Sequence, residues 1–141
     1  MSFSNFHGEK VHSRLVELPA AVRQGIALFN HRDFMEAHHL LQHEWYLEHD
    51  PVRLLYQGIV QIGAAALHVK RGHWRQALTL FERAKPKLEL CPPMFLGVNV
   101  ERLAQEARHC EELMRDLGPD GLPECDLEHF PVIEVEGTRP S

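Results

Sequence analysis

The sequence is poor in cysteine and has no long hydrophobic run. Its 141 residues include three cysteines, Cys91, Cys110 and Cys125, and no two of them form a CxxC pair. An odd number of widely spaced cysteines argues against a disulfide framework and against a zinc ribbon. No apolar run approaches the roughly 20 residues that cross a bilayer, and no signal-peptide pattern opens the chain. We therefore expect free thiols, a cytoplasmic protein and no membrane partner.

An excess of positive charge is also missing. Lys and Arg number 15 against 20 Asp and Glu, which gives a formal net charge of −5 with neutral histidine. Proteins that bind nucleic acids need a cationic surface to displace counterions from phosphates, so we expect no nucleic-acid partner. Histidine, in contrast, is abundant, with 11 residues. Its imidazole is suited to metal binding and to proton transfer near neutral pH.

Hydrophobic periodicity predicts an all-α fold, a compact bundle of about five helices. Apolar residues recur every three or four positions, which is the spacing of one helix face. The expected helices cover residues 18–30, 34–47, 52–70, 73–85 and 99–118. We expect residues 1–17 to form an N-terminal arm, residues 18–118 a single helical domain, and residues 119–141 an acidic, partly extended tail. Trp45 and Phe81 are expected at the centre of the bundle.

Single residues predict where some helices begin and end. Asp33 followed by Glu36 has the spacing of a capping box for the second helix. Pro86 lacks a backbone donor and is expected to kink or end the fourth helix. Asn99 is a suitable cap for the fifth helix, and Gly118 is expected to end it.

Two helical hairpins repeat with an offset of 40 residues. Phe34, Ala37 and Leu41 recur as Trp74, Ala77 and Phe81, and the turn Arg32-Asp33 recurs as Gly72-His73. A small residue followed four positions later by a large one resembles the packing of tetratricopeptide hairpins. The period is longer than in that repeat, and two hairpins are too few for a stable solenoid. The pattern therefore predicts tetratricopeptide-like hairpins within a closed bundle.

Residues 29–38 carry the most specific motif of the chain. Their phenylalanine-asparagine start and their later Phe-x-Glu-Ala-His run resemble the opening of the bacterial and archaeal family of domain of unknown function 309. Trp45, residues 57–61, His68 and Arg71-Gly72 continue that family's pattern, so that the resemblance covers roughly residues 20–110. It implies a compact all-helical domain without an established activity. The chain departs from the family's acidic positions at His39 and Gln42.

One group of polar side chains falls beside the apolar stripes of the second and third helices. Its members are His38, Gln42, Gln57, Gln61 and His68. Gln57, Gln61 and His68 share one stripe of a helix, and antiparallel packing brings His38 toward it. Imidazoles and amides together suit a small polar ligand or a weakly held metal. The same side chains also fit a buried hydrogen-bond network or a solvent-facing surface, and the sequence leaves all three readings open.

A second group shares the outer face of the second helix. Glu36, His39 and His43 follow at i, i+3 and i+7, and the two histidines form an HxxxH pair that can chelate a transition metal. The chain has no HExxH motif, so no general base accompanies this pair. The group therefore fits a divalent metal site, an ion bridging two chains, or a plain solvated face.

Two functions from different classes remain. The first is a non-enzymatic interaction module that offers a groove to a protein partner or to a second copy of itself. The repeated hairpins and the absence of Walker A, GxGxxG and GxSxG motifs favour it. The second is a metal-dependent, hydrolase-like enzyme that uses His38 and His68, which the histidine excess suggests.

Overall fold

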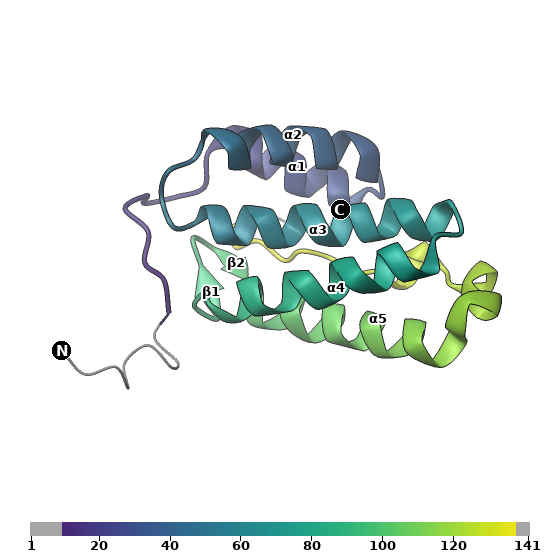
Figure 1. Ribbon diagram of the computed structural model, residues 1–141. Coiled ribbons are helices and arrows are strands. Elements are labelled where there is room, and N and C mark those ends of the chain that lie inside the picture. Colours follow the sequence, from purple (N-terminus) through teal and green to yellow (C-terminus); the bar gives the residue numbers. More distant parts are fainter. Residues whose placement is uncertain (1–9, 138–141) are drawn as a thin grey trace.

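The computed structural model describes residues 10–137, and its described part is dominated by five helices (Figure 1). These are α1 (Ala20–Asn30), α2 (Phe34–Leu47), α3 (Arg53–Lys70), α4 (Trp74–Glu89) and α5 (Val100–Gly121). A small hairpin of β1 (Met94–Phe95) and β2 (Val98–Asn99) precedes α5, and two short 3-10 turns follow it, η2 (Leu122–Glu124) and η3 (Leu127–His129). The predicted all-α bundle is confirmed.

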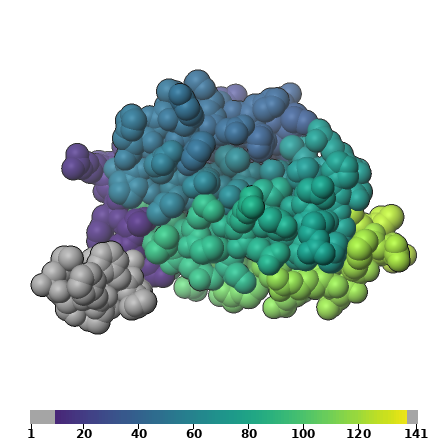
Figure 2. Space-filling view, viewed as in Figure 1, coloured from purple at the N-terminus to yellow at the C-terminus, as the bar shows by residue number. Residues whose placement is uncertain are grey.

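The helices pack in chain order, each against the next. In Figure 1, α3 lies in the middle, with α1 and α2 on one side and α4 and α5 on the other. The space between α1 and α5 is filled by residues 125–137, which we call the C-terminal segment and which pass behind α3. In the same view, the side chains of α3 and α4 cover this segment (Figure 2).

Helix α3 is central because it is apolar around most of its circumference. Leu55, Ile59 and Ile62 are fully buried, and two glycines let neighbouring helices come close. A Cβ atom on Gly58 would lie 2.7 Å from Cδ2 of Leu88 in α4. A side chain at position 58 would therefore require Leu88 to move, and glycine lets Leu88 pack directly on the backbone of α3. The described residues include no helix long and apolar enough to cross a membrane.

The 40-residue offset is visible in the backbone of the two hairpin turns. Arg32 has φ 69° and Gly72 has φ 76°, so both turns pass through the left-handed region. The Asp33 amide donates to Leu28 O at 2.9 Å, and the His73 amide donates to His68 O at 2.8 Å. The two turns thus share one conformation, although only one of them uses glycine for the strained position. The likeness to tetratricopeptide packing stays a prediction.

The structure bears on three of the expected helix boundaries. The capping box at Asp33 is wrong, because its side chain accepts no hydrogen bond from the helix. The Asn99 cap is confirmed, since its side chain accepts from the Arg102 amide at 3.0 Å. Gly118 leaves the helical region with φ 66°, as expected, and one further turn follows it within α5.

Pro86 does not end α4 near residue 85, where the sequence predicted its end. The helix continues to Glu89, and Leu88, three residues from its predicted end, is buried against Gly58. Packing of that last turn on α3 outweighs the loss of one backbone hydrogen bond at the proline. The β1–β2 hairpin was also missed, since a two-residue strand is too short to produce a detectable alternation.

A buried carboxylate joins α4 to α5. Glu111 is 2% exposed, and its oxygens lie 2.6 Å from Nη1 of Arg115 and 3.5 Å from Nζ of Lys85. The two cations offset the cost of removing this carboxylate from water. The charged contact therefore fixes how the two helices align, beside the apolar contacts of their facing stripes.

The aromatic core differs in part from expectation. Phe81 is 1% exposed and packs against Phe130 with ring centroids 5.5 Å apart, as a central residue should. Trp45, in contrast, is only half-buried, and the Arg53 guanidinium lies 4.8 Å from its ring centroid. The α2–α3 turn places Trp45 at the edge of the bundle, where one face of its ring meets a cation.

Replacing Phe81 with alanine should lower the free energy of unfolding by about 3–5 kcal/mol, because a cavity opens between α4 and the C-terminal segment. Tyr46→Ala is the matched control, since it also truncates an aromatic ring but at a position that is 75% exposed. Urea melts of both variants measure the difference. Equal stabilities for the two would contradict the assignment of the core.

Candidate functional site

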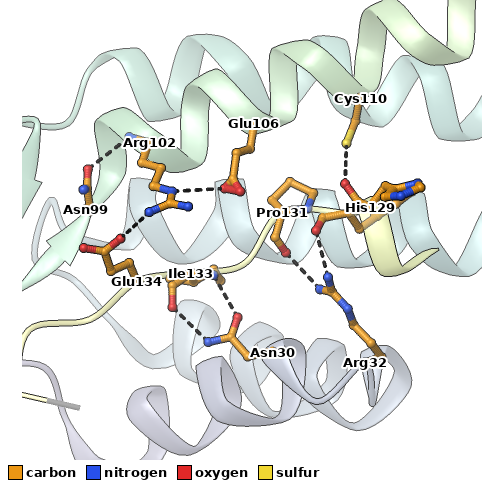
Figure 3. A network of polar contacts seen from close by, with 11 residues as sticks. Asn30, Arg32, Asn99, Arg102, Glu106, Cys110, His129, Pro131, Ile133 and Glu134 are labelled. Atoms are coloured by element: carbon orange, nitrogen blue, oxygen red, sulfur yellow. Dashed lines mark hydrogen bonds and ion pairs between the residues drawn. The ribbon is translucent and has the colours of Figure 1, made fainter. Parts of the chain in front are cut away.

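The most specific polar contacts of the molecule hold the C-terminal segment in its groove (Figure 3). The side chain of Asn30, at the end of α1, makes two hydrogen bonds to one residue of that segment. The Ile133 amide donates to Asn30 Oδ1 at 2.8 Å, and Asn30 Nδ2 donates to Ile133 O at 2.9 Å. An asparagine amide thus pairs with an extended backbone as a neighbouring β-strand would.

Arg32, in the turn after α1, binds three main-chain carbonyls of the same segment. Its Nη1 donates to Pro131 O at 3.0 Å, and its Nη2 donates to Phe130 O at 2.8 Å and to Glu128 O at 3.1 Å. The positive φ of Arg32 directs the chain so that the guanidinium reaches these carbonyls. Asn30 and Arg32 therefore bind main-chain atoms, which any extended segment offers.

On its other side the segment pairs with β2. The Asn99 amide donates to Glu134 O at 2.9 Å, and the Glu136 amide donates to Gly97 O at 2.7 Å. The Glu134 carboxylate also binds Arg102 Nη1 of α5 at 2.9 Å (Figure 3). Phe130, Pro131, Ile133 and Val135 are buried beneath, while Val132, Glu134 and Glu136 are exposed. This alternation of buried and exposed side chains is typical of an extended strand with one face buried.

A cleft of about 810 Å³ remains open between α1, the β1–β2 hairpin and the exposed face of the C-terminal segment. Arg23, Ile26 and Ala27 line it from α1. Met94 and Val132 contribute apolar side chains that are 47% and 46% exposed. The volume falls within the range of ligand-binding clefts in proteins. No periodicity in the sequence indicates this cleft, because α1 and the C-terminal segment, two of its walls, lie about 100 residues apart in the chain.

The first group of predicted site residues is spread along α2 and α3. His38 lies half-buried on α2 with its ring nearest to His39, at 6.0 Å between centroids. His68 lies at the end of α3 and contacts His73 of the next turn. Gln57 and Gln61 are partly buried on α3, and Gln61 Oε1 has no hydrogen-bond partner. Gln42 is exposed.

The second group, Glu36, His39 and His43, is exposed along the outer face of α2. His39, Gln42 and His43 border a shallow surface hollow with Trp45 and Tyr46. Over residues 10–137 no three side chains of His, Cys, Asp or Glu come together as a group that could hold a metal ion. Neither predicted metal site therefore has three protein ligands within the described part of one chain, which is the usual minimum for catalytic zinc.

Burial changes the ionisation of several groups. It lowers the pKa of His38, and the nearby His39 lowers it further. The pKa of His68 is lowered by burial, then by His73 and Arg71. Burial raises the pKa of the Cys91 and Cys110 thiols to about 12, which makes them poor nucleophiles at neutral pH.

Replacing Asn30 with alanine should lower the free energy of unfolding by about 2 kcal/mol, since it leaves the amide and carbonyl of Ile133 unpaired. Hydrogen exchange should accelerate most in residues 130–136. Gln24→Ala, an exposed position on α1, is the control and should change neither quantity. Uniform acceleration over the whole chain would mean that the segment is not a separate opening unit.

The free energy of unfolding should fall as the pH is lowered below about 6.5, and His38 should contribute to this fall. Burial holds the folded-state pKa of His38 below its ordinary value of about 6.5, so the unfolded chain takes up more protons in that range. Urea melts of His38→Gln between pH 5 and 7 should give a flatter profile than the native chain. His109→Gln, at an exposed position of α5, is the control; an equal flattening there would remove His38 as the cause.

Comparison with known proteins bears on the helical part of the chain. Residues 22–80 match the family model described as domain of unknown function DUF309, and this range spans the first hairpin, α3 and the beginning of α4. No curated protein and no solved structure is significantly similar to the chain. The match confirms, over residues 22–80, the resemblance predicted from the sequence motifs.

Proposed function

We propose that this protein is a non-enzymatic interaction module, which binds an extended segment of a protein partner in the cleft beside its C-terminal segment. One observation carries the proposal: the space between α1 and α5 already accommodates an extended polypeptide, and about 810 Å³ stays open next to it. Recognition of a second extended chain needs the same shape and the same kinds of side chain.

The lining of the cleft indicates the chemistry of the partner segment. Met94 and Val132 expose apolar surface, which suits an aliphatic or aromatic side chain. Arg23 is exposed on α1, and its side chain forms no hydrogen bond or ion pair with other described residues. A cation of this kind attracts a carboxylate, so we propose a partner segment in which apolar and acidic residues alternate. Glu134 in the C-terminal segment makes the equivalent contact with Arg102.

The state of the cysteines supports placing this module in the cytoplasm. All three cysteines are free, and two of them are buried thiols without a partner cysteine. Free thiols are normal where glutathione keeps the compartment reducing.

The proposal is tested by panning a displayed library of random ten-residue peptides on the full-length protein. Enriched peptides should share the alternation of apolar and acidic residues. Titration calorimetry with a synthetic enriched peptide should show at least tenfold weaker binding to Arg23→Glu. Arg83→Glu is the matched control, because this exposed arginine lies on α4, away from the cleft.

Light scattering on the same samples distinguishes a partner from a second copy. A concentration-dependent dimer that Arg23→Glu disrupts would make a second copy the occupant and replace the proposed partner segment. Failure to enrich any peptide, or equal binding to both charge-reversed variants, would remove the proposal.

A further inference from the structure

Two imidazoles meet at the turn between α3 and α4. The Nδ1 atoms of His68 and His73 lie 3.1 Å apart, and the ring centroids are 5.3 Å apart at an angle of 42°. In the absence of an ion, one neutral ring donates its Nδ1 hydrogen to the other. Neither histidine lines the cleft, so the proposed binding of a partner segment makes no use of this pair.

We propose that His68 and His73 form a two-nitrogen chelate for a divalent transition-metal ion such as Zn²⁺. Two nitrogen ligands at the usual Zn–N distance of about 2.0–2.1 Å lie about 3.3 Å apart in tetrahedral geometry. The observed 3.1 Å between the Nδ1 atoms is close to that separation. A metal ion can therefore replace the shared hydrogen with only a small movement of the rings. The ring that carried its proton on Nδ1 takes a proton on Nε2 from solvent as the Nδ1 proton leaves, so both rings stay neutral and both Nδ1 atoms become ligands.

The backbone holds the two residues in place. The His73 amide donates to His68 O at 2.8 Å, and the Gly72 amide donates to Val69 O at 3.1 Å. Gly72 adopts φ 76° between them, a conformation that glycine reaches without strain. Because both Cα positions are fixed by these bonds, a metal ion would have little backbone motion to restrict on binding.

The first hairpin shows that this turn does not require histidine. The equivalent turn has the same hydrogen bond, from the Asp33 amide to Leu28 O at 2.9 Å, yet it carries Leu28 and Asp33 where the second turn carries His68 and His73. The turn therefore forms with or without histidine at these two positions. The imidazole pair is a property of the second turn alone, and it needs an explanation besides backbone geometry.

The surroundings set the expected strength and ligand number. His73 is exposed and His68 is partly exposed, so water can complete the coordination of an ion. Across the described residues no carboxylate or thiol joins the pair as a third ligand. Arg71 and Lys70 lie nearby and disfavour a cation. We therefore expect a site of moderate affinity that favours ions with strong preference for nitrogen ligands.

The experiment uses the full-length chain without a histidine tag, freed of metal by dialysis against a chelator. Titration calorimetry with ZnCl₂ at pH 7.5 should show one site, and binding to His68→Gln/His73→Gln should be at least tenfold weaker. His39→Gln/His43→Gln is the matched control, since it removes two exposed histidines spaced for chelation on α2 and should retain the site. Circular dichroism verifies that both double variants keep their helices.

Nitrogen-15 spectra of the imidazoles identify the ligands directly, because only the coordinated rings shift in proportion to bound Zn²⁺. Shifts confined to His68 and His73 support the proposal. Shifts confined to His39 and His43, unchanged affinity in the His68/His73 double variant, or no measurable heat would each overturn it. None of these outcomes depends on peptide binding, so the metal site and the proposed function succeed or fail separately.

Discussion

The placement of the C-terminal segment depends on one aromatic side chain. Phe130 packs between Phe34 of α2 and Phe81 of α4, with ring centroids 6.1 and 5.5 Å away. The segment that carries Phe130 runs between the first and last helices, α1 and α5. Without the Phe130 ring, the apolar side chains that face this segment would surround an empty space. Burying Phe130 brings the backbone of the following residues into the groove, where each polar group needs a partner. Asn30, Arg32 and β2 supply those partners.

This arrangement makes the molecule different from an open helical repeat. In helical repeats the concave surface stays available to ligands. Here the extended C-terminal segment is bound by Asn30 and Arg32 of the first hairpin, and a cleft stays open beside it. The filled part contributes stability, and the open part is where we place binding. The same groove thus serves folding and the proposed interaction.

The helices could be predicted from the sequence because each is determined by local periodicity. The predicted range 34–47 is the range of α2, and α3 begins one residue after its predicted start. The site could not be predicted in this way. Asn30 and Arg32 lie in the motif of residues 29–38 and at the end of a predicted helix, and neither feature indicates their contacts with main-chain atoms about 100 residues away. Contacts of that sequence separation leave no periodic signal.

The histidines show the same limit in a second form. From their spacing, His38 and His68 are predicted to approach each other across two packed helices, and His39 and His43 to share one helix face. Among residues 10–137, the imidazoles that come closest are instead those of His68 and His73, across a turn whose left-handed glycine reverses the chain. The 40-residue offset contained the information for that turn, since Arg32-Asp33 aligns with Gly72-His73. Both turns share one hydrogen bond and one residue with positive φ, so these are what the backbone conformation requires. His68 and His73 are not required by it, since the first turn has Leu28 and Asp33 at these positions.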